Sequence, residues 1–490
     1  MSTRPARGIA IVGAGASGAL TAIRLLQQAE RHSTPFELWL IDPADHDGRG
    51  SAYGTDDPSH LLNVLAGRMS AFAEDPDHFV RWLARQDPRL ADANAYIPRM
   101  RYGAYLADTL DHAVRRHRTA PLRRIRDRVI SAGGDGTRLR LGLASGAACE
   151  VDAAVLALGN FAPSCAWAPA PLLASSGFIA DPWAPGALAG IPSGSDVLLV
   201  GTGLTMADVA LTLEHPGRIV HAVSRHGLLP HGHTTDPGPA LAAPQLSGRQ
   251  GLPQLRRAVL RHLAVCRRLQ GDWRRGLDGL RSHTSALWQE LPADDRARFL
   301  ERDMRLWEVH RHRMPPSCAA KLDQTRKAGR LRVDIASVAD AVVTDTDIQV
   351  HLSDDRVLRV GAVVNCTGAR ADLAMIDDPL LQDLFRSGLA RTGPHGLGFD
   401  TEPDGRLHAA CGQTRPMLWT LGALRRGQLF ETTAIPEIRV QAQDIAGSLV
   451  RQLSAARYRG PASVRPGAGP IATAASADVN AGNLGPGRTC

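Results

Sequence analysis

A short apolar strand that runs directly into glycines and then into a helix occurs twice in this chain. The first copy begins with the apolar run at residues 9–13, continues at helical spacing and ends in a second strand at 37–42. The second copy repeats the same order over residues 196–223. A strand–turn–helix–strand unit of this kind is the nucleotide-binding half of a Rossmann fold. Two copies predict an α/β fold with two Rossmann-like dinucleotide-binding domains, the arrangement of a two-dinucleotide-binding flavoprotein.

The first glycine-rich turn carries a complete dinucleotide-binding pattern, G-x-G-x-x-G, that includes Ser17. Gly13 makes the tight turn, Gly15 lets the backbone approach a pyrophosphate, and Gly18 allows close packing of helix on strand. The N-terminus of the helix then stabilises the phosphate charge. Asp42 ends the second strand, where it can accept hydrogen bonds from ribose hydroxyls. We predict that this copy binds FAD.

The second turn contains Gly201 and Gly203 but has Met206 in place of the third glycine. A larger residue there moves the helix slightly from the strand and leaves the phosphate turn intact. Ser224 and Arg225 follow the next strand, where the 2′-phosphate of NADPH would lie; the alternative is an ordinary surface arginine. Two dinucleotide sites suit one cofactor that stays bound and one that binds and dissociates in each cycle. We therefore predict FAD as the bound cofactor and NAD(P)H as its reductant.

Alternating apolar and polar residues over 122–158 predict a small β-meander that leads to an apolar strand and Gly159. A similar arrangement over 331–368 ends at Gly368. In flavoproteins with two dinucleotide sites, strands of this type return the chain between the domains. Gly159 and Gly368 are therefore predicted to lie beside the cofactors.

Residues 255–330 show apolar positions at helical spacing with arginines on the opposite faces, and a last helix is expected at 436–453. From residue 460 the chain is rich in Ala, Gly, Pro and Ser. The predicted organisation is an FAD-binding domain at 1–165, an NAD(P)H-binding unit at 190–235, a helical insertion at 236–330, a return of the FAD-binding domain at 331–455 and a disordered tail at 456–490.

Composition excludes several other classes of protein. The net charge is +8, yet aromatic residues make up only 4% of the chain, and no nucleic-acid motif is present. The seven cysteines are scattered without a C-x-x-C pair, which favours a reducing compartment and excludes a vicinal redox disulfide. Residues 1–8 do not resemble a signal peptide, and no apolar run reaches membrane-spanning length. We expect a cytoplasmic protein; its oligomeric state is left open.

Further motifs resemble those of a family of FAD/NAD(P)-binding flavoproteins that contains FAD-dependent urate hydroxylases of the HpyO type and nitrosuccinate-forming aspartate N-monooxygenases. The resemblance covers nearly the whole chain up to about residue 455. Its motifs lie at residues 50–54 (GSAYG), 60–64 (HLLNV), 67–71 (GRMSA), 81–83 (RWL), 98–99 (PR), 102–103 (YG), 224–230 (SRHGLLP), 307–314 (WEVHRHRM) and 431–437 (ETTAIPE).

The resemblance implies an enzyme in which NAD(P)H reduces FAD and the reduced flavin activates O2. The expected reaction is hydroxylation of a small anionic nitrogen-containing substrate, urate-like or the amine of an amino acid, through a flavin C4a-hydroperoxide. Tyr53, within the GSAYG motif, is expected to contact the cofactor. One alternative is a flavin dehydrogenase or reductase that inserts no oxygen. Another is a nucleotide sensor whose helices at 255–330 contact a partner.

Several residues are placed to contact the flavin ring. Gly422 and the helix that opens near Pro436 would direct backbone N–H groups at the flavin pyrimidine and stabilise the anionic reduced ring. Thr432 and Thr433 are candidate caps of that helix; ordinary capping with no flavin nearby is the alternative.

Asn63 and Met69 lie in a loop expected to cover the isoalloxazine, and we predict catalytic roles for both. Asn63 would donate hydrogen bonds and Met69 would pack on the ring, although a plain core methionine explains Met69 equally well.

Arginines and histidines at 310–313 suggest either an anion site or a metal site. Arg311 and Arg313 are candidates for binding an anionic substrate, with surface salt bridges as the alternative. His310 and His312 alternate without an evident third ligand, as do His231 and His233, so no metal site is predicted.

Overall fold

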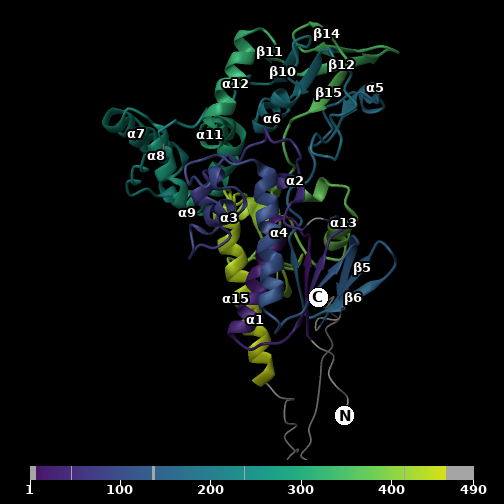
Figure 1. Cartoon of the computed structure of the whole chain (residues 1–490), viewed down its shortest axis with the longest axis vertical. Helices are drawn as coiled ribbons and strands as arrows, with labels where there is room; N and C mark the ends of the chain where they lie inside the picture. The colour runs from purple at the N-terminus through teal and green to yellow at the C-terminus, as the bar shows by residue number, and fades with distance from the viewer. Residues whose placement is uncertain (1–6, 46, 135–137, 237, 413, 459–490) are drawn as a thin grey trace, which may run out of the picture.

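The computed structural model describes residues 7–45, 47–134, 138–236, 238–412 and 414–458 (Figure 1). The tail predicted to be disordered lies outside these residues, apart from its first three positions, which are helical. The two predicted dinucleotide units form separate sheets, one at each end of the long axis of the molecule (Figure 1).

The first sheet has six strands in the order β16-β17-β7-β1-β2-β3, parallel except for the edge strand β16. The inner strands are apolar and buried on both sides, as a parallel sheet covered on both faces requires. The strands are β1 (Gly8–Val12), β2 (Glu37–Ile41), β3 (Leu122–Ile125), β7 (Ala153–Leu156), β16 (Arg406–His408) and β17 (Thr414–Thr420).

Helices cover one face of the first sheet, and a small antiparallel sheet covers the other (Figure 1). The helical face is formed by α1 (Ala16–Arg31), α4 (Arg99–Arg116) and α15 (Ile435–Tyr458), with α3 (His78–Gln86) beside them. The other face carries β4 (Val129–Gly134), β5 (Leu139–Leu143), β6 (Ala148–Val151) and α13 (Pro379–Arg386). The last helix is thus longer than the predicted 436–453.

The second sheet has five parallel strands in the order β11-β10-β9-β15-β8. They are β8 (Phe178–Ile179), β9 (Val197–Val200), β10 (Val220–Ser224), β11 (Leu331–Ile335) and β15 (Ala362–Asn365). One face packs on α6 (Leu204–Thr212) and α12 (Pro316–Lys327). The other packs on α5 (Ala170–Leu173) and on the antiparallel strands β12 (Val338–Val343), β13 (Ile348–Leu352) and β14 (Val357–Val360).

The two units repeat each other in detail. Gly13 and Gly201 have positive φ angles of 102° and 108°. A Cβ atom on Gly13 would lie 2.4 Å from the carbonyl oxygen of Ala157, and one on Gly201 would lie 2.3 Å from that of Cys366. Each glycine turn is therefore held against the end of its own crossover strand, β7 or β15, by the same close approach. The prediction of two Rossmann-like units is confirmed.

The structure corrects two boundaries. Residues 331–365 were expected to return to the FAD-binding domain, but β11 pairs with β10 and β15 with β9, so this segment completes the second sheet. The return begins only after β15. Likewise, Leu122–Ile125 joins β2 in the first sheet, and the meander is formed by β4, β5 and β6 alone. Alternation of apolar and polar residues identifies strands but not their partners.

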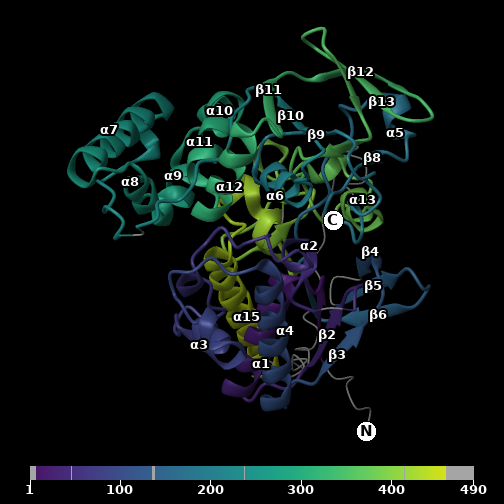
Figure 2. The ribbon, with the colours of Figure 1, turned by 45° about the horizontal axis from the view of Figure 1, so that its top comes forward.

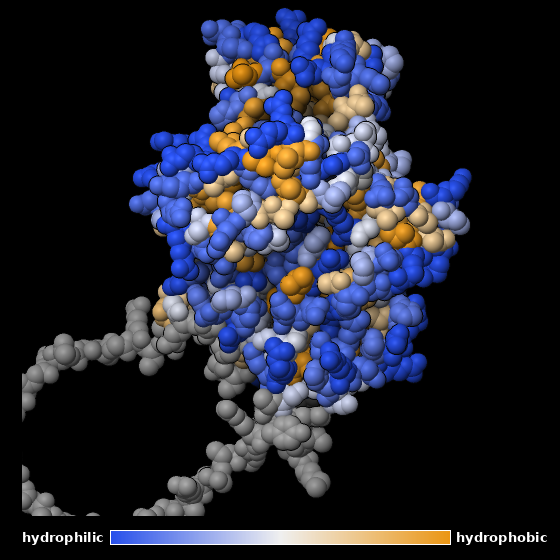
Figure 3. All heavy atoms as spheres, turned by 90° about the vertical axis from the view of Figure 1, so that its left-hand side faces the viewer, coloured by the Kyte–Doolittle hydropathy of each residue, from blue (hydrophilic) through white to orange (hydrophobic). Residues whose placement is uncertain are grey.

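Most of the predicted helical insertion projects to one side of the molecule (Figure 2), but its last helix, α12, packs on the second sheet and so belongs to that unit. The projecting part contains α7 (Leu252–Gln270), α8 (Arg274–Gly279), α9 (Thr284–Glu290), α10 (Ala293–Arg298) and α11 (Met304–Arg311). Apolar side chains lie among polar ones on this side (Figure 3). Within the described ranges, no helix is both long and apolar enough to cross a membrane.

The insertion is anchored on a short segment that contains α14 (Arg426–Leu429). The indole N–H of Trp288 donates to the carbonyl of Gly427 at 2.9 Å, and the Trp288 ring stacks on Phe430. The Ser285 hydroxyl donates to the carbonyl of Leu429 at 2.9 Å. These contacts bring residues about 140 positions apart together beside the N-terminus of α15.

Candidate functional site

The first glycine turn leaves the N-terminus of α1 open to a ligand. No side chain caps this helix, and its first turn has no acidic residue. A Cβ on Gly15 would meet only Gly50, at 3.5 Å, so no backbone obstructs the approach. A Cβ on Gly18 would lie 1.9 Å from the carbonyl oxygen of Gly13, which confirms that this glycine is required for packing. Free N–H groups and the helix dipole fit a pyrophosphate at this position.

Asp42 fixes the same turn from the end of β2. Its carboxylate accepts from the backbone N–H of Ala14 at 2.7 Å and of Ala44 at 2.8 Å. Carboxylate oxygens have further lone pairs, so ribose hydroxyls can still donate to them. A Cβ on Gly422 would lie 3.3 Å from the hydroxyl of buried Ser17, so the C-terminal part of the chain closes over the N-terminus of α1.

The second glycine turn has the same open geometry. Helix α6 has no side-chain cap and no acidic residue in its first turn, and a Cβ on Gly203 would have no neighbour within 4 Å. Met206, in the first turn of α6, is fully buried in the core of the second unit. The Ser224 hydroxyl lies 2.8 Å from that of Thr202, so it shapes the turn, whereas Arg225 is exposed.

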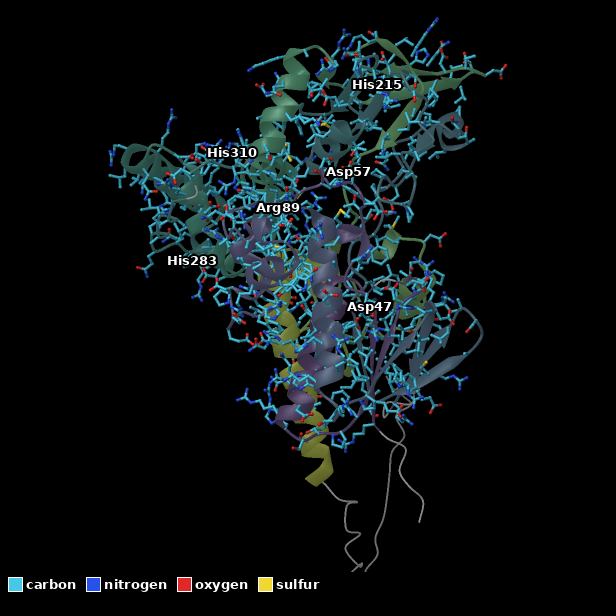
Figure 4. The ribbon with its side chains drawn as sticks, viewed as in Figure 1. Asp47, Asp57, Arg89, His215, His283 and His310 are labelled. Atoms are coloured by element: carbon cyan, nitrogen blue, oxygen red, sulfur yellow. The ribbon has the colours of Figure 1, made fainter. Side chains whose placement is uncertain are left out.

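Polar contacts hold the two dinucleotide units together. The guanidinium of Arg99 lies 2.7 Å from the buried carboxylate of Asp208 on α6. The Thr212 hydroxyl at the end of α6 donates to Asp57 at 2.5 Å, and Asp57 lies between the two ends of the molecule (Figure 4). Burial raises the pKa of Asp208 even though Arg99 opposes this effect.

A cavity of about 500 Å³ lies where the two units and the helical insertion meet. It is bordered by the carboxyl ends of parallel strands, where ligands bind in open α/β sheets. Predicted site residues that line it are Tyr53, Asn63, Met69, Arg311, Arg313, Gly368, Thr432 and Thr433. Gly159 has a positive φ of 70°, as does Gly368 at 91°, and Gly159 precedes the lining residue Asn160.

The structure places Arg311 and Arg313 in the cavity wall, not on the surface. Arg311 lies 2.9 Å from the carboxylate of Glu431, and both side chains are largely buried. The Arg313 guanidinium, only 1% exposed, is paired with Asp278. The surface salt bridge is therefore the wrong alternative for both residues. An anionic substrate would have to compete with Glu431 or Asp278 for these guanidinium groups.

Ion pairs also join the insertion to α14 and to the first turn of α15. Arg281 and Glu437 form two parallel hydrogen bonds of 2.7 and 2.8 Å. Arg426 lies 3.0 Å from Glu308. Sequence reasoning missed these pairs because their members are 156 and 118 residues apart, beyond any periodic pattern.

Met69 is both a core and a cavity residue, since it is 3% exposed and packs in the core of the first unit. The backbone carbonyl of Asn63 accepts a hydrogen bond of 3.1 Å from His233 Nε2. Burial lowers the pKa of His233 to about 4, so its ring is neutral near neutral pH. Burial also raises the pKa of the neighbouring Tyr96 to about 12. Both side chains line the cavity.

Gln441 organises the end of the chain that faces the cavity. Its amide nitrogen donates to the Thr432 hydroxyl at 2.7 Å, and its amide oxygen accepts from the backbone N–H of Gly422 at 3.1 Å. Helix α15 begins at Ile435, and its first backbone bonds run to the carbonyl of Ala434. The hydroxyl of Thr432 is thus engaged by Gln441, while Thr433 lines the cavity.

The described parts of the chain contain no group of three or more His, Cys, Asp or Glu side chains that could hold a metal ion. His231 and His310 pack with ring centroids 4.5 Å apart, next to Trp273. His310 lies where the insertion joins the body of the molecule (Figure 4).

Comparisons with known proteins agree with this geometry. Residues 10–161 match the family described as FAD-NAD(P)-binding. A search of curated proteins gives no match. The family match and the two open glycine turns support FAD and NAD(P) as the cofactors, as predicted.

Solved structures share the fold along most of the chain. The ornithine hydroxylase of Pseudomonas aeruginosa is 17% identical with a TM-score of 0.60, covering 91% of this chain and 99% of its own. The ornithine N-hydroxylase of Kutzneria sp. 744 is 14% identical with a TM-score of 0.59, covering 92% and 100%. The bacillithiol disulfide reductase of Bacillus cereus is 13% identical with a TM-score of 0.52, covering 91% and 99%.

At such low identities the likeness establishes the fold alone. The predicted fold class is confirmed, and so is the resemblance to FAD/NAD(P)-binding flavoproteins at that general level. The more specific resemblance to urate hydroxylases and aspartate N-monooxygenases stays a prediction, since a likeness in fold does not distinguish substrates.

Proposed function

We propose that this chain is a flavin- and NAD(P)H-dependent monooxygenase that transfers one oxygen atom from O2 to the nitrogen of a small amine. The observation that carries the proposal is the single cavity bordered by both dinucleotide units and closed on its third side by the helical insertion. Two neighbours in fold are described as ornithine hydroxylases, which supports an amine as the substrate class.

A reductase that inserts no oxygen is the second candidate, because a disulfide reductase shares the fold. A chain-borne dithiol relay would need cysteines at the flavin, but no described cysteine lines the cavity. Burial raises the pKa of Cys366, the cysteine closest in sequence to the cavity residue Gly368, which makes this thiol unreactive. These features favour oxygen chemistry.

The N-termini of α1 and α6 are suited to bind the two cofactors. The free N–H groups of α1 would bind the FAD pyrophosphate, and those of α6 would bind the pyrophosphate of NAD(P)H. When bound, FAD would take two electrons from NAD(P)H and use them to activate O2. The N-terminus of α15 would face the flavin pyrimidine and stabilise negative charge there. The backbone N–H of Gly422 does not fit the role expected for it, because it already donates to the side chain of Gln441.

The insertion would exclude water from the reacting groups. Its ion pairs with α14 and with the first turn of α15 hold it over the cavity, and Met69 and Phe430 add apolar surface to the wall. Exclusion of water protects reactive oxygen species from decay to peroxide, which an oxygen-transferring enzyme needs and a simple reductase does not.

The test combines a spectrum with a coupled assay. Purified protein should show flavin absorbance and, with the correct amine, consume NAD(P)H and O2 in equal amounts with little H2O2. A panel of ornithine, lysine, aspartate, simple diamines and urate should contain one compound that yields a hydroxylated nitrogen, detected by mass spectrometry. NAD(P)H oxidation that depends on an added acceptor, without oxygenated product, would instead establish the reductase.

A further inference from the structure

His312 is a histidine that faces the cavity with no partner for its ring. It follows α11, and its backbone N–H donates to the carbonyl of Glu308 at 2.8 Å. The His312 side chain is exposed and lines the cavity, and the protein that packs around it desolvates the ring in part. Within the described part of the chain, neither ring nitrogen makes a hydrogen bond, whereas Nδ1 of the nearby His310 lies 2.8 Å from the carbonyl of Leu306.

The charged groups around His312 are already paired with one another. From its own helix, Arg311 is bound to Glu431, and Arg305 is bound to Glu308 at 2.7 Å. From α14, Arg426 is bound to the same Glu308 at 3.0 Å. Three guanidinium groups therefore face two carboxylates, which leaves a small excess of positive charge and no unpaired carboxylate to stabilise an imidazolium.

Burial, with the charge of Arg311 added to it, lowers the pKa of His312. The ring is therefore neutral at neutral pH, with one nitrogen protonated and the other free to accept a proton. The same excess of positive charge would lower the pKa of an ammonium group in the cavity, which reduces the cost of transferring its proton to the ring.

We propose that His312 is the base that deprotonates the substrate nitrogen. An amine arrives mainly as R–NH3+, which has no lone pair to attack oxygen. One N–H bond of the ammonium breaks, its electron pair stays on nitrogen as the lone pair of R–NH2, and the proton forms a bond to the free imidazole nitrogen. The imidazolium then releases this proton to water. This inference rests on the proposed function, since only oxygenation of nitrogen requires the lone pair.

The decisive variant is His312→Gln, whose amide can still form hydrogen bonds but cannot take a proton at neutral pH. The matched control is His310→Gln, two residues away. We expect His312→Gln to keep its flavin spectrum and its rate of anaerobic flavin reduction by NAD(P)H. Its kcat/KM for the amine should fall by about 10²–10⁴-fold, while NAD(P)H oxidation continues with release of H2O2. His310→Gln should behave like the wild type.

The pH profile and chemical rescue separate a base from a merely structural residue. Wild-type kcat/KM should decline as pH falls through the pKa of His312, because protonation removes the base, and this decline should be absent in His312→Gln. Added imidazole should restore amine hydroxylation by His312→Ala. An unchanged kcat/KM and pH profile in His312→Gln, or no rescue of a folded, flavin-loaded His312→Ala, would overturn the proposal.

A measurement without turnover tests the same group. In a histidine-labelled NMR titration of the wild-type protein, the ring resonance that disappears in His312→Gln should titrate below the ordinary histidine pKa of about 6.5. A midpoint above that value would contradict a neutral base. If wild-type protein reduces its flavin but hydroxylates no amine, the proposed function fails; if it hydroxylates an amine and His312→Gln does so equally well, only the role of His312 fails.

Discussion

Replacing Gly203 with alanine should weaken NAD(P)H binding without unfolding the protein. Gly203 has φ −84° and ψ −163°, a conformation open to alanine, and the added Cβ would have no neighbour within 4 Å. Alanine has less conformational freedom than glycine in the unfolded chain, which stabilises the folded protein by about 0.4–1 kcal/mol. Alanine is also a poorer N-cap than glycine, which costs a similar amount. The free energy of unfolding should therefore change by less than about 1 kcal/mol.

The ligand should respond much more strongly, because the methyl group would stand where the N-terminus of α6 meets the pyrophosphate. Loss of one hydrogen bond to a charged phosphate costs about 1.5–3 kcal/mol. Since about 1.4 kcal/mol is a factor of ten, the apparent Kd for NAD(P)H should rise by roughly 10- to 150-fold.

Gly201→Ala is the matched control with the opposite expectation. Gly201 has a φ of 108°, so alanine there adds backbone strain of about 1–3 kcal/mol. The added Cβ would lie 2.3 Å from the Cys366 carbonyl oxygen, and this overpacking costs about 1–3 kcal/mol more. Thermal unfolding should show a clear loss of stability for Gly201→Ala and almost none for Gly203→Ala. Anaerobic stopped-flow reduction of the flavin over a range of NAD(P)H concentrations gives the Kd. An unchanged Kd in Gly203→Ala would refute the assignment of this turn to NAD(P)H.

Three further predictions follow from the site. Asp42→Ala should lower the fraction of FAD retained after gel filtration, measured by absorbance; full retention would count against the ribose role of Asp42. Arg281→Ala leaves Glu437 unpaired in a partly buried place and should destabilise the protein by about 1–3 kcal/mol in urea unfolding, against less than about 0.5 kcal/mol for the exposed Lys327→Ala. His233 has a pKa of about 4 when folded and about 6.5 when unfolded, so the unfolded state binds more protons between these values. The stability that comes from the neutral His233 ring is fully present above pH 6.5 and is lost as pH falls towards 4. The free energy of unfolding of His233→Gln should therefore fall less than that of the wild type between pH 6.5 and 4.

Ion pairs between the insertion and the segments α14 and α15 set the charge of the cavity wall. In the pair Arg281–Glu437 the insertion contributes the arginine, and in the pair Arg426–Glu308 it contributes the carboxylate. These pairs neutralise much of the positive charge of the arginine-rich wall and leave a small excess of it.

The sequence alone determined the two nucleotide-binding units and the roles of their glycines. A tight turn at positive φ, a buried strand and a helix start are properties of consecutive residues, so Gly13, Gly18 and Gly201 could be assigned from spacing. The same local patterns located the helical insertion and both antiparallel meanders. They could not show which strands pair, because alternation is the same whichever sheet a strand joins.

Only the tertiary structure decided what the polar residues do. Arg311 and Arg313 resembled free cations until the fold placed Glu431 and Asp278 beside them, 120 and 35 residues away in sequence. The sequence places His312 only in a possible anion or metal site, and its position in the cavity wall depends on how the insertion meets α14. Whether a side chain is charged, and whether it can accept a proton, depends on its burial and on the charges beside it. Those neighbours come from segments far apart in sequence, so no local pattern predicts them.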